Sequence, residues 1–379
     1  MDFAIGSRAA GHTAKADELA AVTSNYSYDS IYELTQVLQG TTTDLPGSTR
    51  RRPGSPAWES YSYDPVGNRT ASLGVASYTT NTSNEMTANS NASYTYDANG
   101  NTLTKVVGSN TTSYAWDYEN RLTSVTLPSS GGTVTFKYDP FGRRIEKISP
   151  SATSIFLYDG DNLVQTVNSS GSVIARYAQG LTIDEPLAME RGTTIDYYEA
   201  DGLGSITSLT TASGTVAQSY TYDSFGNLTN SSGSLTNFLR YAGREFDTET
   251  GLYYYRGRYY DSTAGRFASE DPVHFTGGVN FFRYVGNNPV LFSDPTGLCP
   301  ASSPSTPYQK FKNFVCHPVT ALYAGAVAGA AAPLSSLGGS AEGGAILTLY
   351  GEAGEAAAVS GPVGWGLFLG FAAWGFYCL

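Results

Sequence analysis

The sequence predicts a mostly β protein in which stacked β-hairpins form a curved or shell-like sheet. The 379 residues include 28 Tyr and 42 Gly, a composition that favours strands joined by tight turns. Only 15% of the residues are charged, which argues against a highly charged disordered chain. A Tyr-Asp motif also returns at intervals near 20 residues, and this spacing suits one hairpin per repeat.

Charge and cysteine usage exclude several classes of protein. The net charge of −11 argues against a basic nucleic-acid binder. Three Cys cannot make a disulfide framework, and three His leave little for a His-rich metal site. We therefore expect no cofactor, no bound metal and no nucleic-acid partner.

Each repeat has the residues that a hairpin needs. In one copy, Tyr94 and Tyr96 alternate along the incoming strand and share one face. Asp97 can accept N–H groups of the turn, and Gly100 supplies a positive φ before the return strand. We expect the repeat aspartates to form turns and not to catalyse a reaction. The copies begin at Tyr28, Tyr63, Tyr96, Trp116, Tyr138, Tyr158 and Tyr222.

The pattern Tyr-Asp-x-x-Gly-x-Leu-Thr resembles the YD repeats of Rhs proteins, of the C component of Tc toxins and of teneurins. Residues 198–298 resemble the Rhs repeat-associated core domain. They contain, in order, the motifs DGLGS, ETGLYYYRGRYYD, GRF, DP, YVGNNP and DPTGL. We therefore predict YD repeats over 1–197, the core domain over 198–298 and a variable segment over 299–379. In that family the repeats form a hollow β-shell around a C-terminal polypeptide, which is often a toxin.

The resemblance implies self-cleavage after the Asp-Pro-x-Gly-Leu motif, between Leu298 and Cys299. The residues that match the family's catalytic positions are Asp271, Asp294 and Arg258, with Arg266 as a second candidate for the basic residue.

The predicted chemistry is an aspartyl-type, single-turnover self-protease. One ionised acid activates water while a protonated acid polarises the carbonyl, and a guanidinium stabilises negative charge. We expect Gly297 to allow an extended chain before the cut. Two alternatives stay open: the Asp-Pro pairs are simple turn formers, or Cys299 attacks the preceding carbonyl in an N-to-S acyl shift.

The composition changes sharply after Leu298. Residues 299–379 hold only five charged side chains, two Lys and three Glu, together with all three Cys. These side chains are too few to bind phosphates and a metal ion in a nuclease, or to form the zinc site of a deaminase. Two apolar stretches, 319–340 and 356–379, instead predict a small helical segment that contacts or inserts into a membrane.

Our main interpretation is an Rhs-type toxin component that cuts itself and releases or retains residues 299–379 as its cargo. It implies delivery machinery, an immunity protein and a secreted or cell-surface location. Residues 1–20 show no signal peptide, so we expect export by another route. The alternatives are a non-enzymatic adhesion module anchored by its apolar tail, and a truncated remnant.

Overall fold

The computed structural model describes residues 12–17, 22–41 and 58–298, with short strands at 301–302, 347–350 and 356–359. The chain divides into two compact units. The first unit holds residues 1–272 and 280–303, and the second holds 273–279 and 304–379. The described part is almost entirely β, as the sequence predicts.

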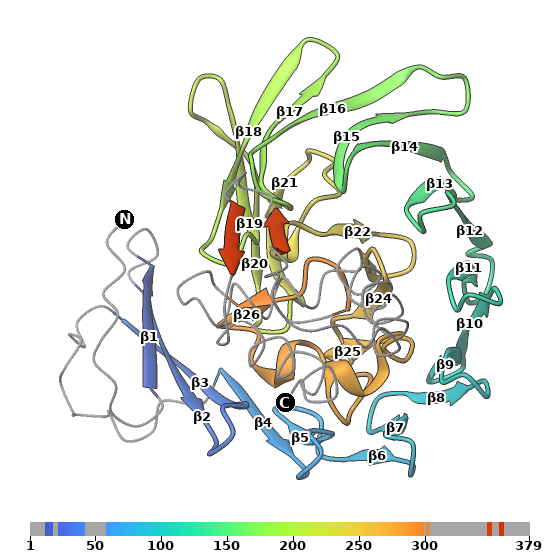
Figure 1. Cartoon of the computed structure of the whole chain (residues 1–379), viewed down its shortest axis with the longest axis vertical. Coiled ribbons are helices and arrows are strands. Elements are labelled where there is room, and N and C mark those ends of the chain that lie inside the picture. Colours follow the sequence, from blue (N-terminus) through green and yellow to red (C-terminus); the bar gives the residue numbers. More distant parts are fainter. Residues whose placement is uncertain are drawn as a thin grey trace, which may run out of the picture. The chain divides into compact units, whose positions relative to one another are not determined.

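A 16-stranded antiparallel sheet forms most of the first unit, and its strands follow one another in sequence order. In Figure 1 these strands follow an arc, with β22 and β24 on its inner side. Its strands are β6 Tyr78–Thr80, β7 Met86–Asn89, β8 Ser93–Tyr96, β9 Thr102–Val107, β10 Asn110–Trp116, β11 Leu122–Thr126, β12 Thr133–Tyr138, β13 Arg144–Ile148, β14 Thr153–Asp159, β15 Asn162–Val167, β16 Val173–Gln179, β17 Pro186–Arg191, β18 Thr194–Ala200, β19 Ile206–Thr211, β20 Val216–Tyr222 and β21 Leu228–Gly233.

The remaining sheets are small. A five-stranded sheet precedes the long one: β1 His12–Asp17, β2 Val22–Tyr28, β3 Leu34–Thr41, β4 Glu59–Tyr63 and β5 Arg69–Ser72. A four-stranded sheet follows it: β22 Glu245–Asp247, β23 Leu252–Tyr255, β24 Arg258–Asp261 and β25 Arg266–Phe267. Two strand pairs complete the set: β26 Phe292–Ser293 with β27 Ala301–Ser302, and β28 Leu347–Tyr350 with β29 Ala356–Val359.

Helical structure in the described residues is limited to three 3₁₀ turns, η1 Tyr241–Gly243, η2 His274–Gly277 and η3 Val285–Asn287. None of the helices among these residues is long and apolar enough to cross a membrane. The predicted helical tail is not confirmed. The described residues of 299–379 form β27, β28 and β29, and the ranges 319–340 and 360–379 lie outside the described residues.

The repeat turns have the predicted geometry. In the turn after β8, Asp97 Oδ1 accepts the N–H groups of Asn99 and Asn101 at 2.9 Å each, and Gly100 has φ +73°. The copy at Tyr158 differs from this pattern. There β14 and β15 are joined by the two residues Gly160 and Asp161, so this connection is too short to hold the Asp-capped turn.

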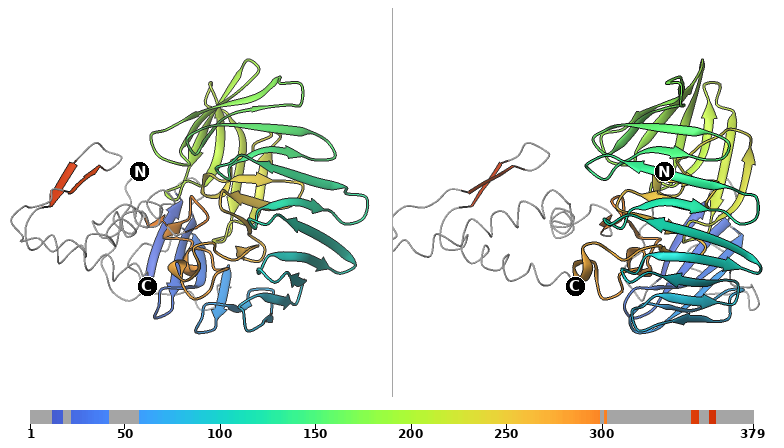
Figure 2. Two further views of the ribbon diagram at one scale, coloured as in Figure 1. Left: turned by 45° about the vertical axis from the view of Figure 1, so that its right-hand side comes forward. Right: turned by 90° about the vertical axis from the view of Figure 1, so that its right-hand side faces the viewer.

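Successive repeats are linked by a second hydrogen bond that the sequence pattern did not predict. In five repeats the aromatic residue before the turn donates to the carbonyl that opens the previous return strand. Tyr138 Oη donates to Leu122 O at 2.6 Å, and Trp116 Nε1 donates to Thr102 O at 2.7 Å. Figure 2 shows the resulting stack of hairpins. The sheet continues through residue 198 because β18 spans Thr194–Ala200, so the domain boundary predicted there is no break in the sheet.

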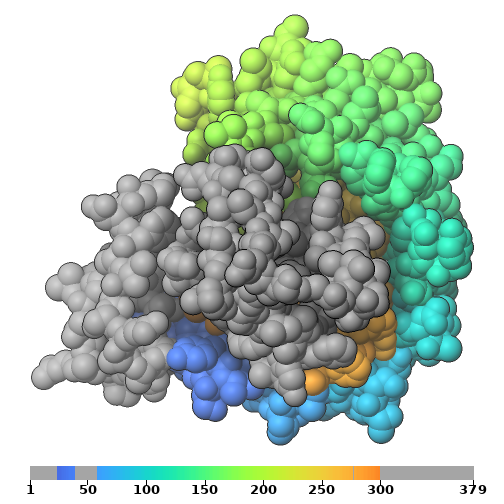
Figure 3. Space-filling view, in the orientation of Figure 1, coloured from blue at the N-terminus to red at the C-terminus, as the bar shows by residue number. Residues whose placement is uncertain are grey.

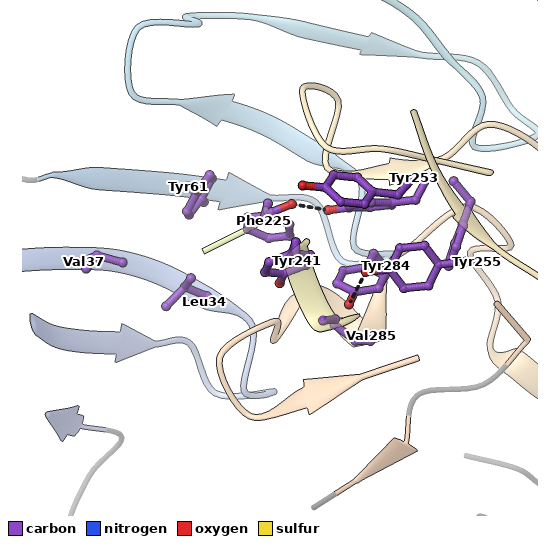
Figure 4. Close-up of a cluster of buried hydrophobic side chains, with 12 residues drawn as sticks. Leu34, Val37, Tyr61, Phe225, Tyr241, Tyr253, Tyr255, Tyr284 and Val285 are labelled. Carbon is purple, nitrogen blue, oxygen red and sulfur yellow. Dashed lines mark hydrogen bonds between the residues drawn. The ribbon is translucent and has the colours of Figure 1, made fainter. Parts of the chain in front are cut away.

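The residues of the small four-stranded sheet pack against the inner face of the long sheet. Leu252, Tyr254 and Tyr259 of this sheet share a buried cluster with Tyr114, Val125 and Phe136 of the long sheet. In Figure 3 atoms drawn in orange, from the part of the chain near residue 298, lie beside atoms drawn in cyan. A buried aromatic cluster holds the last repeat turn, 223–227, in place (Figure 4). Three tyrosines, Tyr241, Tyr260 and Tyr253, donate to three successive carbonyls of this turn, those of Ser224, Phe225 and Gly226. The Glu59 carboxylate of β4 accepts the N–H of Ser224 at 3.1 Å, so early and late parts of the chain meet at this turn.

Candidate active site

Arg258 opens strand β24, directly after the tight turn Arg256–Gly257 that follows β23. Tyr255 and Arg258 are paired across this turn. Arg256 has φ +59°, so the turn reverses the chain within two residues. Because side chains alternate along a strand, this reversal fixes the direction of the Arg258 guanidinium.

The structure brings together the three residues that the sequence predicts as catalytic. Arg258 Nη2 lies 3.0 Å from Asp271 Oδ2 and 3.6 Å from Asp294 Oδ2. All three residues are buried, with exposed fractions of 3%, 5% and 1% for Arg258, Asp271 and Asp294. The guanidinium also stacks on the Phe267 ring, 3.6 Å from its centroid. One buried cation thus contacts two acids that lie 23 positions apart in the sequence.

The segment before the predicted cleavage site is held by the same hairpin. The carbonyls of Pro295, Thr296 and Gly297 accept hydrogen bonds from Arg256 Nη1, from the Gly257 N–H at 2.9 Å and from Arg258 Nε. Three successive carbonyls are therefore fixed by three successive residues.

Gly297 is not extended, contrary to the expectation from the sequence. Its φ is +71°, and a Cβ at this position would lie 2.3 Å from Tyr255 O. The segment folds back because Asp294 Oδ1 accepts the Leu298 N–H at 3.1 Å. Asp294 therefore both forms a turn, as one of the alternatives expected, and contacts Arg258 through its other oxygen.

Arg266, the second candidate for the basic residue, contacts other groups. It stacks 4.7 Å from the centroid of the Phe282 ring and donates to Asn84 O at 2.5 Å. Cys299 lies outside the described residues, so the acyl-shift alternative stays a prediction. Within the described ranges, no group of three His, Cys, Asp or Glu side chains could hold a metal ion.

Two residues near the site were missed by the sequence analysis, Arg256 and Asp184. Arg256 lies in the quoted Arg-Gly-Arg run, and only the structure shows that its side chain reaches Pro295. Asp184 lies in the connection between β16 and β17. That connection has six residues, whereas five residues separate the strands at the Asp97 and Asp223 turns. The extra residue was the available signal.

Burial and neighbouring acids shift the pKa values of tyrosines around the site. Burial raises the pKa of Tyr284 above its ordinary value, and the nearby Asp294 carboxylate adds to this increase. Tyr284 Oη lies 3.1 Å from Tyr255 Oη, and Figure 4 shows these two rings together. Two aromatic side chains, Phe267 and Tyr284, therefore border the site, and low-polarity neighbours strengthen charge interactions.

Comparisons with known proteins show the family to which this chain belongs. A family model described as Teneurin YD-shell matches residues 10–290. The tRNA nuclease WapA of Bacillus subtilis (strain 168) is 34% identical over 254 residues, which cover 62% of this chain and 11% of that protein. The double-stranded DNA deaminase toxin A of Burkholderia cenocepacia (strain H111) is 29% identical over 331 residues, which cover 75% of this chain and 23% of that protein.

The crystal structure of TcdB2-TccC3-Cdc42 aligns with a TM-score of 0.42 at 20% identity, over 73% of this chain and 18% of that one. The chain spans about a tenth to a quarter of the length of the two curated relatives described above. The family match covers well over half of the sequence, and the resemblance to YD-repeat proteins is confirmed. The chain belongs to the teneurin YD-shell family.

Proposed function

We propose that this chain is the shell-and-core part of a YD-repeat toxin, and that it cleaves its own backbone after Leu298. The observation that carries the proposal is the double role of Arg258. Its Nη2 contacts Asp271 and Asp294, and its Nε holds the Gly297 carbonyl. A pair of acids is thereby linked, through one side chain, to the residue before Leu298.

The proposed reaction is hydrolysis of the peptide bond between Leu298 and Cys299. One ionised acid takes a proton from water, whose oxygen adds to the Leu298 carbonyl carbon. The other acid starts protonated and stabilises the tetrahedral intermediate. The C–N bond then breaks and the Cys299 nitrogen receives a proton. With one acid protonated, Arg258 and the two acids are together neutral, the form that burial favours.

A single turnover is sufficient because the substrate is part of the same chain. Holding the segment at the site gives a large effective concentration, which offsets a modest catalyst. The strands on either side of the loop, β26 and β27, are paired through Phe292–Ser302 and Ser293–Ala301. This pairing supports retention of the cut segment until it is delivered.

The toxin assignment rests on the relatives. The names of two of them describe a tRNA nuclease and a DNA deaminase toxin. By analogy, residues 299–379 are the variable effector, and the chain is secreted or displayed at the cell surface. Delivery machinery and an immunity protein are the partners that this role requires. The poverty of charge in 299–379 points to an effector that acts on a membrane and not on nucleic acid.

The proposal is tested by the intact mass of the denatured protein. We expect the wild-type chain to appear as two fragments that meet after Leu298. Asp271→Asn and Asp294→Asn should each stay full length. The second variant is informative because an amide oxygen still accepts the Leu298 N–H, so the turn remains while the acid is lost.

A matched control is Asp97→Asn, which makes the same change in a repeat turn. Asparagine already fills this role at Asn81, whose Oδ1 accepts the N–H groups of Ser83 and Glu85. The control should therefore be cut like the wild type. Cys299→Ala should also be cut, whereas an uncut Cys299→Ala would favour the acyl shift. Wild-type protein that stays full length would contradict self-cleavage.

A further inference from the structure

The connection between β16 and β17 differs from the repeat turns around it. The residue before it, Gln179, takes the place of the repeat tyrosine and donates to Leu163 O at 2.7 Å. Gly180 takes the place of the repeat aspartate, so the usual carboxylate cap is missing. Glu185 replaces part of that cap, since its Oε2 accepts the N–H and hydroxyl of Thr182 at 3.2 and 2.9 Å. The extra residue of this connection sends Asp184 toward the four-stranded sheet.

Asp184 has a left-handed backbone conformation that its neighbours fix. Its φ is +62°, in the left-handed region that residues with a Cβ rarely adopt. The Asn162 side chain accepts its N–H at 3.2 Å. Its carbonyl lies so close to Gly243 that a Cβ there would be 2.7 Å from the oxygen.

The Asp184 carboxylate binds two arginines. Oδ1 accepts from Arg244 Nη1 and, at 2.7 Å, from Arg256 Nη2. Oδ2 accepts from Arg256 Nη1 at 3.0 Å, so the contact with Arg256 is bidentate. The side chains are 10%, 3% and 14% exposed for Asp184, Arg244 and Arg256. Bidentate contacts fix the plane of a guanidinium as well as its position.

The fixed guanidinium reaches the cleavage segment. Arg256 Nη1 donates to the Pro295 carbonyl, and Nη2 donates to Asp161 O at 2.8 Å. Burial acts to lower the pKa of Arg256, but Asp184 more than offsets this and raises the pKa above its ordinary value. The guanidinium that contacts Pro295 is therefore paired with an acid of the loop 180–185.

We propose that Asp184 is a positioning residue for self-cleavage, which acts through Arg256 to hold Pro295 and so to set the register of residues 295–298 against Arg258. This inference rests on the proposed function. It implies that self-cleavage also depends on the long sheet. The loop 180–185, which joins two strands of that sheet, must contact the four-stranded sheet before residues 295–298 are aligned with Arg258. Cleavage is thereby tied to completed folding of the repeats.

The test compares Asp184→Asn with Asp161→Asn in a pulse–chase measurement of cleavage. Both variants remove a negative charge near Arg256. Only the first weakens the bidentate contact, because Asp161 binds Arg256 through its main-chain oxygen. We expect Asp184→Asn to slow cleavage about tenfold to a hundredfold, and Asp161→Asn to stay within about twofold of the wild type. Asp184→Glu keeps the negative charge and should recover part of the cleavage rate. If Asp184 only filled space in the fold, Asp184→Glu would not recover the rate.

A second measurement does not depend on cleavage. In the uncut Asp271→Asn protein, adding Asp184→Asn should speed hydrogen exchange at the Gly297 and Leu298 amides by about tenfold, measured under conditions in which both proteins stay folded. Unchanged exchange would overturn the inference. If the wild type is never cut but Asp184→Asn still loosens this segment, self-cleavage fails as the proposed function while the positioning role stands.

Discussion

Aspartates in the repeat turns and aspartates in the four-stranded sheet have different partners. In the repeats, Asp97 accepts the N–H groups of residues two and four positions ahead in the sequence. In the small sheet, Asp261 is bound by Lys105 Nζ at 2.6 Å, and Asp247 by Arg144 and by Lys147 Nζ, the latter at 3.1 Å. The first kind is satisfied by its own turn, whereas the second also binds a cation at least a hundred residues away. Asp261 does both, because its Oδ1 accepts the Thr263 N–H at 2.9 Å.

This difference separates structural carboxylates from candidates for chemistry. A carboxylate in a repeat turn only accepts N–H groups of that turn, and an amide side chain can do the same. A buried carboxylate bound to a distant cation is a charge that the fold must neutralise, and its removal leaves that cation without a partner. Asp271, Asp294 and Asp184 are likewise buried carboxylates bound to an arginine outside their own turn, 13 to 72 positions away in the sequence. Asp294 also caps its own turn, since its Oδ1 accepts the Leu298 N–H.

Breaking the buried network between the two sheets should have the largest effect on stability. Arg144, 1% exposed, contacts Glu245 at 2.6 Å and also Asp247. Arg144→Met would leave two buried carboxylates with Lys147 as their remaining cation. We expect it to lower the free energy of unfolding by about 3–5 kcal/mol, measured by urea denaturation in the uncut Asp271→Asn background. A loss below about 1 kcal/mol would contradict the assigned role.

A smaller effect is expected from Asp261→Asn, which sharpens the comparison with Asp97→Asn. Burial acts to raise the pKa of Asp261, but Lys105 more than offsets this and lowers it below the ordinary 3.8. We expect a loss of about 1.5–3 kcal/mol at neutral pH for Asp261→Asn, and less than about 0.5 kcal/mol for Asp97→Asn.

The pH dependence of stability tests whether the charge of Asp261 is what stabilises its contact with Lys105. A carboxyl with a lowered folded pKa contributes stability above its unfolded pKa and loses it as the pH falls through the folded value. The difference between wild type and Asp261→Asn should therefore shrink below about pH 4. A difference that stays constant with pH would mean that packing, and not charge, is lost.

The smallest effect, with the opposite sign, is expected at Glu59. Burial raises the pKa of Glu59 above the ordinary 4.5, and the nearby Asp223 adds to the increase. Between these two pKa values the folded state binds more protons than the unfolded state, so stability falls as the pH rises. Glu59→Gln keeps an acceptor for Tyr61 Oη and Ser224 N–H. The free energy of unfolding of Glu59→Gln, relative to that of the wild type, should therefore increase as the pH rises above 4.5. A decrease in the same urea titration would contradict a raised pKa of Glu59.

Much of the fold could be predicted because the repeat is a local pattern. The turn at Asp97 is fixed by residues within five positions, so spacing alone locates it. The same argument failed at Tyr158, where the turn has only two residues, and at Gly297, where we expected an extended chain. In the second case the reason lies outside the local sequence: Tyr255 O leaves no room for a Cβ, and Asp294 draws the Leu298 N–H back.

The sequence by itself determined the hairpin repeat and the turn role of its aspartates, and through the family motifs it predicted Asp271, Asp294 and Arg258 as candidate catalytic residues. These depend on short spacings or on motif order, which a linear chain displays. The tertiary structure alone decided that Arg258 contacts both acids, that Arg256 holds Pro295 and that Asp184 anchors Arg256. Such contacts join residues 13 to 72 positions apart, and they form only when packing of the sheets has brought their strands together.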